Sequence, residues 1–278
     1  MVSEPIPLVL VDGFNLLWRA AYGFPARITA PDGRDVTAMF GFLALLRKAH
    51  RELGQPTECV VVFDGEDGWQ GRQASHPGYK EHRRELDFSP IAWLPAIQQA
   101  LSDNGLVWHE SRGWEADDVI ATLAAGAGER EVVVMSTDRD YHQLLGPTVV
   151  QLNTTRAVDR RVITELEVRD RHGVAPDQWC DYIALVGDRS DAIPGISGIG
   201  PIRARRLLAG GRHLDDLPGS GLLAGAHGRR LAAEFGQALD WRALVTLRTD
   251  LELDISPTGV ATEELPLAAT ILHDQGIW

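Results

Sequence analysis

Acidic side chains occur three times at or just beyond the end of a short apolar run. Asp12 and Asp64 directly follow runs of four or five apolar residues, and Asp138 follows the run at 132–135 after Ser136 and Thr137. One aspartate in such a place is ordinary, because Asp is common in turns and at helix N-caps. Three indicate a shared site, because ligands of open α/β sheets bind outside the carboxyl ends of the strands.

Further acids strengthen this interpretation. Glu115, Asp117 and Asp118 open a predicted helix, where one acid gains a few tenths of a kcal/mol from the helix dipole. Three acids within four residues repel one another, so the dipole alone does not explain them. Asp140 follows Asp138, and two more acids lie in a loop between predicted helices. The complete set is Asp12, Asp64, Glu115, Asp117, Asp118, Asp138, Asp140, Asp188 and Asp191.

A converging set of carboxylates needs cations to offset its repulsion. Oxygen ligands without His or Cys partners favour Mg²⁺ or Mn²⁺ over Zn²⁺. Two such ions, roughly 3.5–4 Å apart, are the usual means of phosphodiester hydrolysis. The formal net charge of −12 argues against a nucleic-acid partner, but without these nine acids it would be −3. The acidity is therefore partly local and leaves room for a basic face elsewhere.

The segment 188–204 has features that suit a polymer backbone. Gly195, Gly198 and Gly200 permit tight turns and expose amide groups before a predicted helix, an arrangement that grips phosphates without reading bases. Plain turn chemistry is the alternative, and Arg203, just beyond, favours the binding interpretation. The turn also offers backbone carbonyls for a monovalent cation, at Leu185, Val186, Pro194, Ile196 and Ile199.

Residues 66–88 are polar and too long for an ordinary connection, which is typical of a functional loop. A solvated mixed-charge loop is the alternative, but the insert directly follows Asp64. Its candidate DNA-binding or catalytic residues are Arg72, Tyr79, Lys80, Arg83 and Arg84. Trp18 and Arg19, one or two turns beyond Asp12, suit base stacking and phosphate binding, although Trp18 suits a core position equally well.

The elements that must position these groups follow from hydrophobic patterning. Near-continuous apolar runs predict strands buried on both faces, as in a parallel sheet. Helical patterns lie between them, over Thr37–Leu53, Ser89–Ser102 and Glu115–Ala127. This alternation predicts an α/β fold with a mostly parallel central sheet flanked by helices.

The predicted organisation has three parts. Residues 1–160 form the α/β core with the insert 66–88, and residues 161–256 form an all-helical region. Within that region a helix–hairpin–helix element spans 176–209, with helices at Pro176–Gly187 and Gly200–Leu208. Residues 257–278 form a C-terminal tail.

Composition and the absence of certain motifs exclude several other classes of protein. No apolar run approaches 18 residues and no secretory signal precedes the first strand, so we expect no membrane association. Cys59 and Cys180 have no metal or redox spacing, which favours a reduced, cytoplasmic protein. The sequence lacks a phosphate-binding loop of kinases, a dinucleotide motif after a strand and the histidine spacing of zinc hydrolases.

The chain resembles the bacterial and phage 5′→3′ exonuclease/flap endonuclease family, including the N-terminal nuclease domain of DNA polymerase I. The resemblance spans roughly residues 6–256, in order and spacing. Its motifs are Val11-Asp12-Gly13, Phe63-Asp64-Gly65, Gly78-Tyr79-Lys80 with Arg83, Glu115-Ala116-Asp117-Asp118, Asp138-Arg139-Asp140 with Gln143-Leu144-Leu145, Gly187-Asp188-Arg189-Ser190-Asp191, Pro194-Gly195 and Gly198-Ile199-Gly200.

The resemblance implies a PIN-like nuclease core, a helical arch and a helix–three-turn–helix DNA-binding element. Asp12, Asp64, Glu115 and Asp117 would lie nearer one divalent ion, and Asp118, Asp138, Asp140, Asp188 and Asp191 nearer the other, several of them acting through water. Lys80 and Arg83 would contact the scissile phosphate, and the turn carbonyls would hold K⁺.

We therefore expect a stand-alone, monomeric nuclease acting on branched, flapped or nicked DNA in replication or repair. The arch segment is short and acid-rich compared with a basic clamp. Two alternatives remain open at this stage. One is a protein that binds DNA junctions without cutting them, and the other is an RNA-cutting nuclease on the same acidic core.

Overall fold

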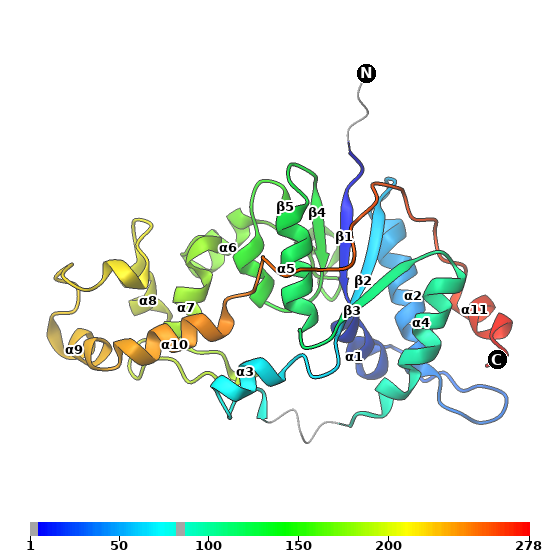
Figure 1. Ribbon diagram of the computed structural model, residues 1–278, viewed down its shortest axis with the longest axis horizontal. Helices are drawn as coiled ribbons and strands as arrows, with labels where there is room; N and C mark the ends of the chain where they lie inside the picture. Colours follow the sequence, from blue (N-terminus) through cyan, green and yellow to red (C-terminus); the bar gives the residue numbers. More distant parts are fainter. Residues whose placement is uncertain (1–4, 82–86) are drawn as a thin grey trace.

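The computed structural model describes residues 5–81 and 87–278. Within them lies a six-stranded sheet of order β3-β2-β1-β4-β5-β6, parallel except for β6, which runs antiparallel to β5 (Figure 1). This confirms the predicted fold class. The strands are β1 Leu8–Asp12, β2 Glu58–Asp64, β3 Val107–Ser111, β4 Val132–Met135, β5 Val149–Leu152 and β6 Val162–Ile163.

The central strands are buried on both faces, which explains their uninterrupted apolar sequences. Leu8 and Leu10 of β1 pack with α5 on one face, while Val9 and Val11 pack with α1 and α2 on the other. The helices around the sheet are α1 Gly13–Gly23, α2 Thr37–Glu52, α4 Leu94–Asp103 and α5 Ala116–Gly126, with the 3₁₀ helices η2 Ser89–Trp93 and η3 Asp140–Leu144.

A second body of helices extends to one side of the sheet (Figure 1). Its buried core contains Trp179, Tyr182 and Leu208 and is separate from the two clusters that cover the sheet. Its α-helices are α6 Glu165–His172, α7 Trp179–Val186, α8 Pro201–Leu208, α9 Gly225–Ala233 and α10 Phe235–Val245. Its 3₁₀ helices are η5 Pro176–Gln178, η6 Arg189–Asp191 and η7 Leu214–Asp216, and η4 Val158–Arg160 precedes it.

The structure corrects several sequence-based expectations. The strands β3 and β5 were not predicted, and β6 lies inside the region expected to be all-helical. The helix expected at Ser89–Ser102 begins as the 3₁₀ helix η2. In its described part, the insert contains the short helix α3, Gln70–Ser75. Arg83 and Arg84 lie outside the described residues.

The C-terminal residues pack against the core. Helix α11, Ala268–Asp274, lies against α2 and buries Leu272 completely (Figure 1). The preceding segment is held by the buried carboxylate of Glu58, which accepts hydrogen bonds from the amides of Thr258 and Gly259. No helix in the described part of the chain is long and apolar enough to cross a membrane.

Replacing Leu272 by Ala tests whether α11 contributes to stability. Removal of a fully buried leucine should lower the free energy of unfolding by about 2–5 kcal/mol. The matched control is Leu267→Ala, at a position that is 60% exposed, which should change it by less than about 0.5 kcal/mol. Urea unfolding measures both, and equal small effects would contradict the observed packing.

Candidate functional site

The parallel register brings the predicted strand-end acids to one edge of the sheet. Asp12 pairs with Val62 at the end of β1 and β2, and β4 ends beside β1. Asp12, Asp64 and Asp138 therefore line one cavity of about 570 Å³, together with Asp117 and Lys80.

Asp12 is both a helix cap and a member of the acidic site. Its side chain accepts from the amide of Asn15 at 3.0 Å and thereby caps α1. Its other oxygen accepts from the Ser136 hydroxyl at 2.9 Å. Burial, with contributions from the charges of Asp64 and Asp138, raises the pKa of Asp12 to about 7.

Two more acids have the same electrostatic character. Burial raises the pKa of Asp117 well above its usual value, and the charges of Asp12 and Asp138 add to the effect. Burial likewise raises the pKa of Asp140, reinforced by Asp138 and Asp191. These mutual effects link Asp12 of β1, Asp117 of α5, Asp138 and Asp140 after β4 and Asp191 of the 188–191 loop into one group.

Glu115 differs from these acids because two basic side chains, Lys80 and Arg72, bind its two carboxylate oxygens. Its Oε1 lies 2.5 Å from Lys80 Nζ, and its Oε2 accepts from Arg72 and, at 3.2 Å, from the Tyr79 hydroxyl. Burial acts to raise the pKa of Glu115, but Lys80 and Arg72 outweigh it and lower that pKa. Lys80 is itself buried and has a left-handed φ of 52°, a strained backbone of the kind that concentrates at functional sites.

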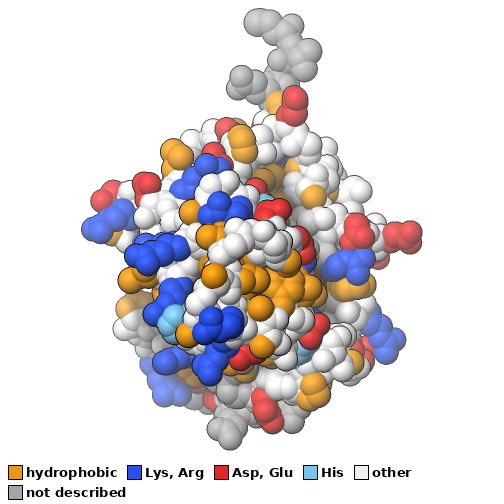
Figure 2. Space-filling model, turned by 90° about the vertical axis from the view of Figure 1, so that its left-hand side faces the viewer, with side chains coloured by type: hydrophobic (Ala, Val, Ile, Leu, Met, Phe, Trp, Pro, Cys, Tyr) orange, Lys and Arg blue, Asp and Glu red, His pale blue; other side chains and the backbone are white. Residues whose placement is uncertain are grey.

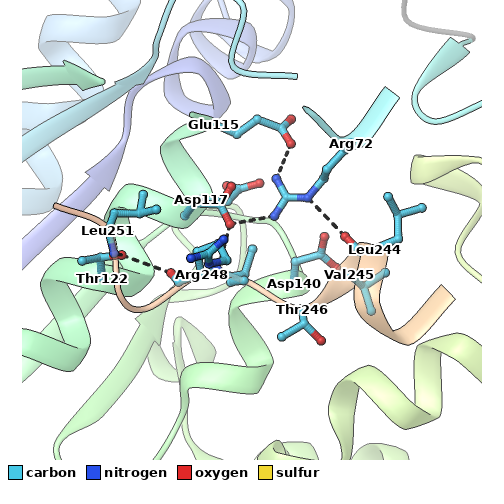
Figure 3. Close-up of polar contacts among 12 residues, drawn as sticks. Arg72, Glu115, Asp117, Thr122, Asp140, Leu244, Val245, Thr246, Arg248 and Leu251 are labelled. Atoms are coloured by element: carbon cyan, nitrogen blue, oxygen red, sulfur yellow. Dashed lines mark hydrogen bonds and ion pairs between the residues drawn. The ribbon is translucent and has the colours of Figure 1, made fainter. Parts of the chain in front are cut away.

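Asp118 lies beside this group with different partners. Its Oδ1 accepts from Arg72 Nη2 at 2.7 Å and from the Arg248 amide at 2.9 Å. Figure 3 shows Arg72 reaching between the start of α5 and the end of α10. Asp188 also has partners of its own, since it accepts from Arg139 at 2.7 Å and from the Ser190 amide.

In residues 5–81 and 87–278, no group of three or more His, Cys, Asp or Glu side chains is arranged as a metal site. The chemistry of the donor set fits hard divalent cations, because carboxylate oxygens of Asp12, Asp64, Asp117 and Asp138 are crowded into one cavity. Bound cations would relieve the repulsion that raises the pKa values of Asp12, Asp117 and Asp140.

The turn between α7 and α8 is tightly folded around its glycines. Gly195 has a φ of 67°, and a Cβ there would lie 2.4 Å from the Gly187 nitrogen. The Leu185 carbonyl, one of the predicted cation ligands, accepts from the Ile196 amide at 2.9 Å, and the Ile196 carbonyl accepts from the Ile199 amide at 2.9 Å. The Leu185–Ile196 bond thus folds the turn back onto the end of α7, and Val186 and Pro194 line one cavity beside it.

Comparison with known proteins identifies the family. A family model described as the 5′-3′ exonuclease N-terminal resolvase-like domain matches residues 7–173, and one described as the 5′-3′ exonuclease C-terminal SAM fold matches residues 174–266. The chain belongs to the 5′-3′ exonuclease family.

Two relatives illustrate the range of this family. The flap endonuclease Xni of Klebsiella pneumoniae is 36% identical over 258 residues, which cover 90% of this chain and 95% of that protein. The thermostable DNA polymerase I of Thermus filiformis is 38% identical over 209 residues, covering 74% of this chain. The chain spans about a quarter of the length of that polymerase.

A solved structure has the same fold. The bacteriophage T5 D15 flap endonuclease, in a pseudo-enzyme-product complex with DNA and metal ions, superposes with a TM-score of 0.65 and 21% identity. The alignment covers 86% of this chain and 88% of that chain. This likeness confirms the predicted combination of a sheet-centred core and a helical region for the exonuclease-family chain.

The predicted DNA-binding residues of this family member lie in different settings. Trp18 and Arg19 line the acidic cavity, where Trp18 stacks on Tyr22 at 5.8 Å between ring centroids. Arg203 is exposed on α8. Tyr79, in contrast, is only 5% exposed and bonds Glu115, and Arg72 is engaged with acids and a backbone carbonyl.

The end of the molecule formed by the helical region presents arginine side chains around exposed hydrophobic surface (Figure 2). Exposed residues of this region include Ile202 and Arg203 of α8, at the first turn after Gly200. The glycine-rich turn is therefore followed at once by an exposed arginine, and the contact of this turn with DNA stays a prediction.

Sequence reasoning missed two side chains that organise the acids. Tyr141 is fully buried, and its hydroxyl bonds Asp117 at 2.6 Å and Asp12 at 3.4 Å. Ser136 joins Asp12 to the amide of Asp138. The contacts with Asp12 and Asp117 join positions at least 24 residues apart, and their only sequence signal is proximity to Asp138.

The raised pKa of Asp12 predicts how the stability of the metal-free protein varies with pH. Between about pH 4 and pH 7 the folded state holds a proton that the unfolded state has lost, so the free energy of unfolding falls as pH rises. Asp12→Asn removes the contribution of Asp12 protonation to the free energy of unfolding, which is at most about 4 kcal/mol.

Urea unfolding in EDTA at pH 5 and pH 8 measures the effect. Wild type should lose more stability over this interval than Asp12→Asn does, and Mg²⁺ should reverse the loss at pH 8. Identical pH profiles for the two proteins would contradict the prediction.

Proposed function

We propose that this chain is a structure-specific 5′ nuclease, a 5′→3′ exonuclease and flap endonuclease that hydrolyses DNA phosphodiesters with two Mg²⁺ or Mn²⁺ ions. The observation that carries the proposal is the convergence of acids from β1, β2, α5 and the segment after β4 on one cavity that also contains a buried lysine. Support also comes from the Xni flap endonuclease, which is similar over nearly its whole length.

The residues of the cavity divide into groups with different roles. Asp12, Asp64, Asp117, Asp138 and Asp140 would hold the cations, and Asp191 completes the group from the loop after α7. When bound, the two cations activate a water molecule and stabilise the in-line displacement at phosphorus, leaving 5′-phosphate and 3′-hydroxyl ends. Asp118 and Asp188 would act at greater distance, through water.

Lys80 and Arg19 provide positive charge on the substrate side. Both line the acidic cavity. Lys80 is bound to Glu115, so its charge is held close to the carboxylates and would meet the scissile phosphate. Arg19 forms no ion pair with any residue that the structure describes, and burial lowers its pKa, so a phosphate would stabilise its charged form.

The helical region would hold the duplex of a flapped, nicked or branched DNA. The support is the glycine-rich turn before α8, whose amides and neighbouring arginines suit phosphate contacts that position a helix without reading its sequence. We extend the proposal to K⁺ at the carbonyls of Leu185, Val186, Pro194, Ile196 and Ile199, which lie at the end of α7 and in the turn after it.

Asp138→Ala tests the catalytic part of the proposal. Loss of this carboxylate should reduce cleavage of a 5′-labelled flap duplex in Mg²⁺ or Mn²⁺ by roughly 100-fold or more, as for removal of other electrostatic groups. The control is Asp159→Ala, at a carboxylate that is 75% exposed on η4 and should be neutral. Full activity of Asp138→Ala, or no cleavage by wild type with either ion, would refute the proposal.

The same assay separates the alternatives. A protein that only binds DNA junctions would bind the flap selectively in EDTA and show no turnover in metal. An RNA-cutting nuclease would be inhibited more strongly by an unlabelled RNA hairpin than by the unlabelled DNA flap. We expect turnover of DNA and weak inhibition by RNA.

A further inference from the structure

Arg72 of α3 is not presented to solvent. Its side chain is 15% exposed, and its three nitrogens bond three residues from two segments. Nη1 bonds Glu115 and Nη2 bonds Asp118 at 2.7 Å, both at the start of α5, and Nε donates to the Leu244 carbonyl of α10 at 3.1 Å (Figure 3). Each nitrogen of the guanidinium therefore has a partner inside the protein.

The far end of this network is the turn that follows α10. There the chain leaves the helical region and returns to the sheet. Asp118, held by Arg72, accepts from the Arg248 amide at 2.9 Å, while Arg72 itself binds the Leu244 carbonyl. Arg72 and Asp118 together fix both ends of residues 244–248.

A second link holds the same turn from the opposite side. Gln143 accepts from the Leu247 amide at 2.9 Å and donates to the Val245 carbonyl at 3.0 Å. Its amide group also donates to the Asp140 carbonyl at 2.8 Å. Each link therefore ends at a residue of the acidic site, Glu115 in one case and Asp140 in the other.

The helix that leads into this turn belongs to the helical region. Helix α10 packs on α7, and α7 leads directly into the glycine-rich turn. A displacement of the helical region would thus move Leu244 against Arg72 and, through Arg72, disturb the orientation of Glu115. Lysine cannot replace this residue, because a single ammonium group does not reproduce three divergent bonds.

We propose that Arg72 is a positioning residue that couples the placement of the helical region to the orientation of Glu115, and that it does not contact DNA. The proposal rests on the proposed nuclease function and deepens it. It also replaces the sequence-based expectation that Arg72 binds the DNA backbone.

The experiment compares full-length Arg72→Gln and Arg72→Lys with Arg203→Gln, a matched loss of an exposed arginine. Flap-DNA affinity is measured in EDTA over a range of salt concentrations, and single-turnover cleavage is measured in Mg²⁺ at saturating enzyme. All assays are run at a temperature at which near-ultraviolet circular dichroism shows each variant to be folded.

Arg72→Gln should keep the wild-type salt dependence of binding and lose at least about 10-fold in the single-turnover rate. Arg72→Lys should not restore the rate, because lysine keeps the positive charge but lacks the divergent N–H donors of the guanidinium. Arg203→Gln should reduce the slope of log K against log salt by about 0.9, because an exposed arginine that contacts one phosphate releases one counterion.

Two results would overturn the proposal. A reduced salt slope in Arg72→Gln that Arg72→Lys restores would show a direct phosphate contact. A wild-type single-turnover rate in folded Arg72→Gln would show that the network serves stability alone.

Hydrogen exchange separates failure of this proposal from failure of the nuclease function, because it does not depend on cleavage. The amides of Leu247 and Arg248 should exchange faster in Arg72→Gln and Arg72→Lys than in wild type, even if wild type cleaves no substrate. Unchanged exchange at these amides would overturn the coupling. Because both variants are measured, one that misfolds does not remove the test.

Discussion

Like charges held close together in a poorly solvated space dominate this protein. Asp12, Asp117 and Asp140 are each harder to ionise because of burial and because of one another. Among the described residues, Lys80 and Arg72 are both bound to Glu115, and Arg19 lines the same cavity. Without added cations the site is left with more negative charge than its own residues neutralise, which gives divalent ions a structural role as well as a chemical one.

Several side chains around the crowded carboxylates make two kinds of contact at once. Asp12 caps α1 while contributing a carboxylate to the cavity, and Ser136 bonds Asp12 while holding the amide of Asp138. The Tyr141 hydroxyl lies between Asp12 and Asp117. A change at any of these positions therefore alters both the local backbone and the charge distribution of the site.

The central strands and their terminal acids were predictable because each strand is buried on both faces and reads as a continuous apolar run. The edge strand β3 was missed because Val107–Ser111 includes a histidine and a glutamate and is partly exposed. The convergence of Asp12, Asp64 and Asp138 followed from sheet topology alone.

Contacts between distant segments set the limit of the sequence-based analysis. Arg72 resembles a DNA-binding residue when only its own loop is considered, because nothing local reveals Asp118 or Leu244 as partners. Tyr79 is similar, since its burial depends on the helical region. The ligand roles of Asp118 and Asp188, and the domain boundaries, remain predictions.

The return of the chain from α10 to the sheet has a consequence for dissecting the molecule. Leu247 is buried among the residues that cover the α5 face, and Leu251, Leu253 and Ile255 pack on the same cluster. Residues that follow the helical region thus complete the hydrophobic core on the α5 face of the sheet. A fragment cut near residue 173 would expose this apolar face to water, so the two halves are better separated by point substitutions than by truncation.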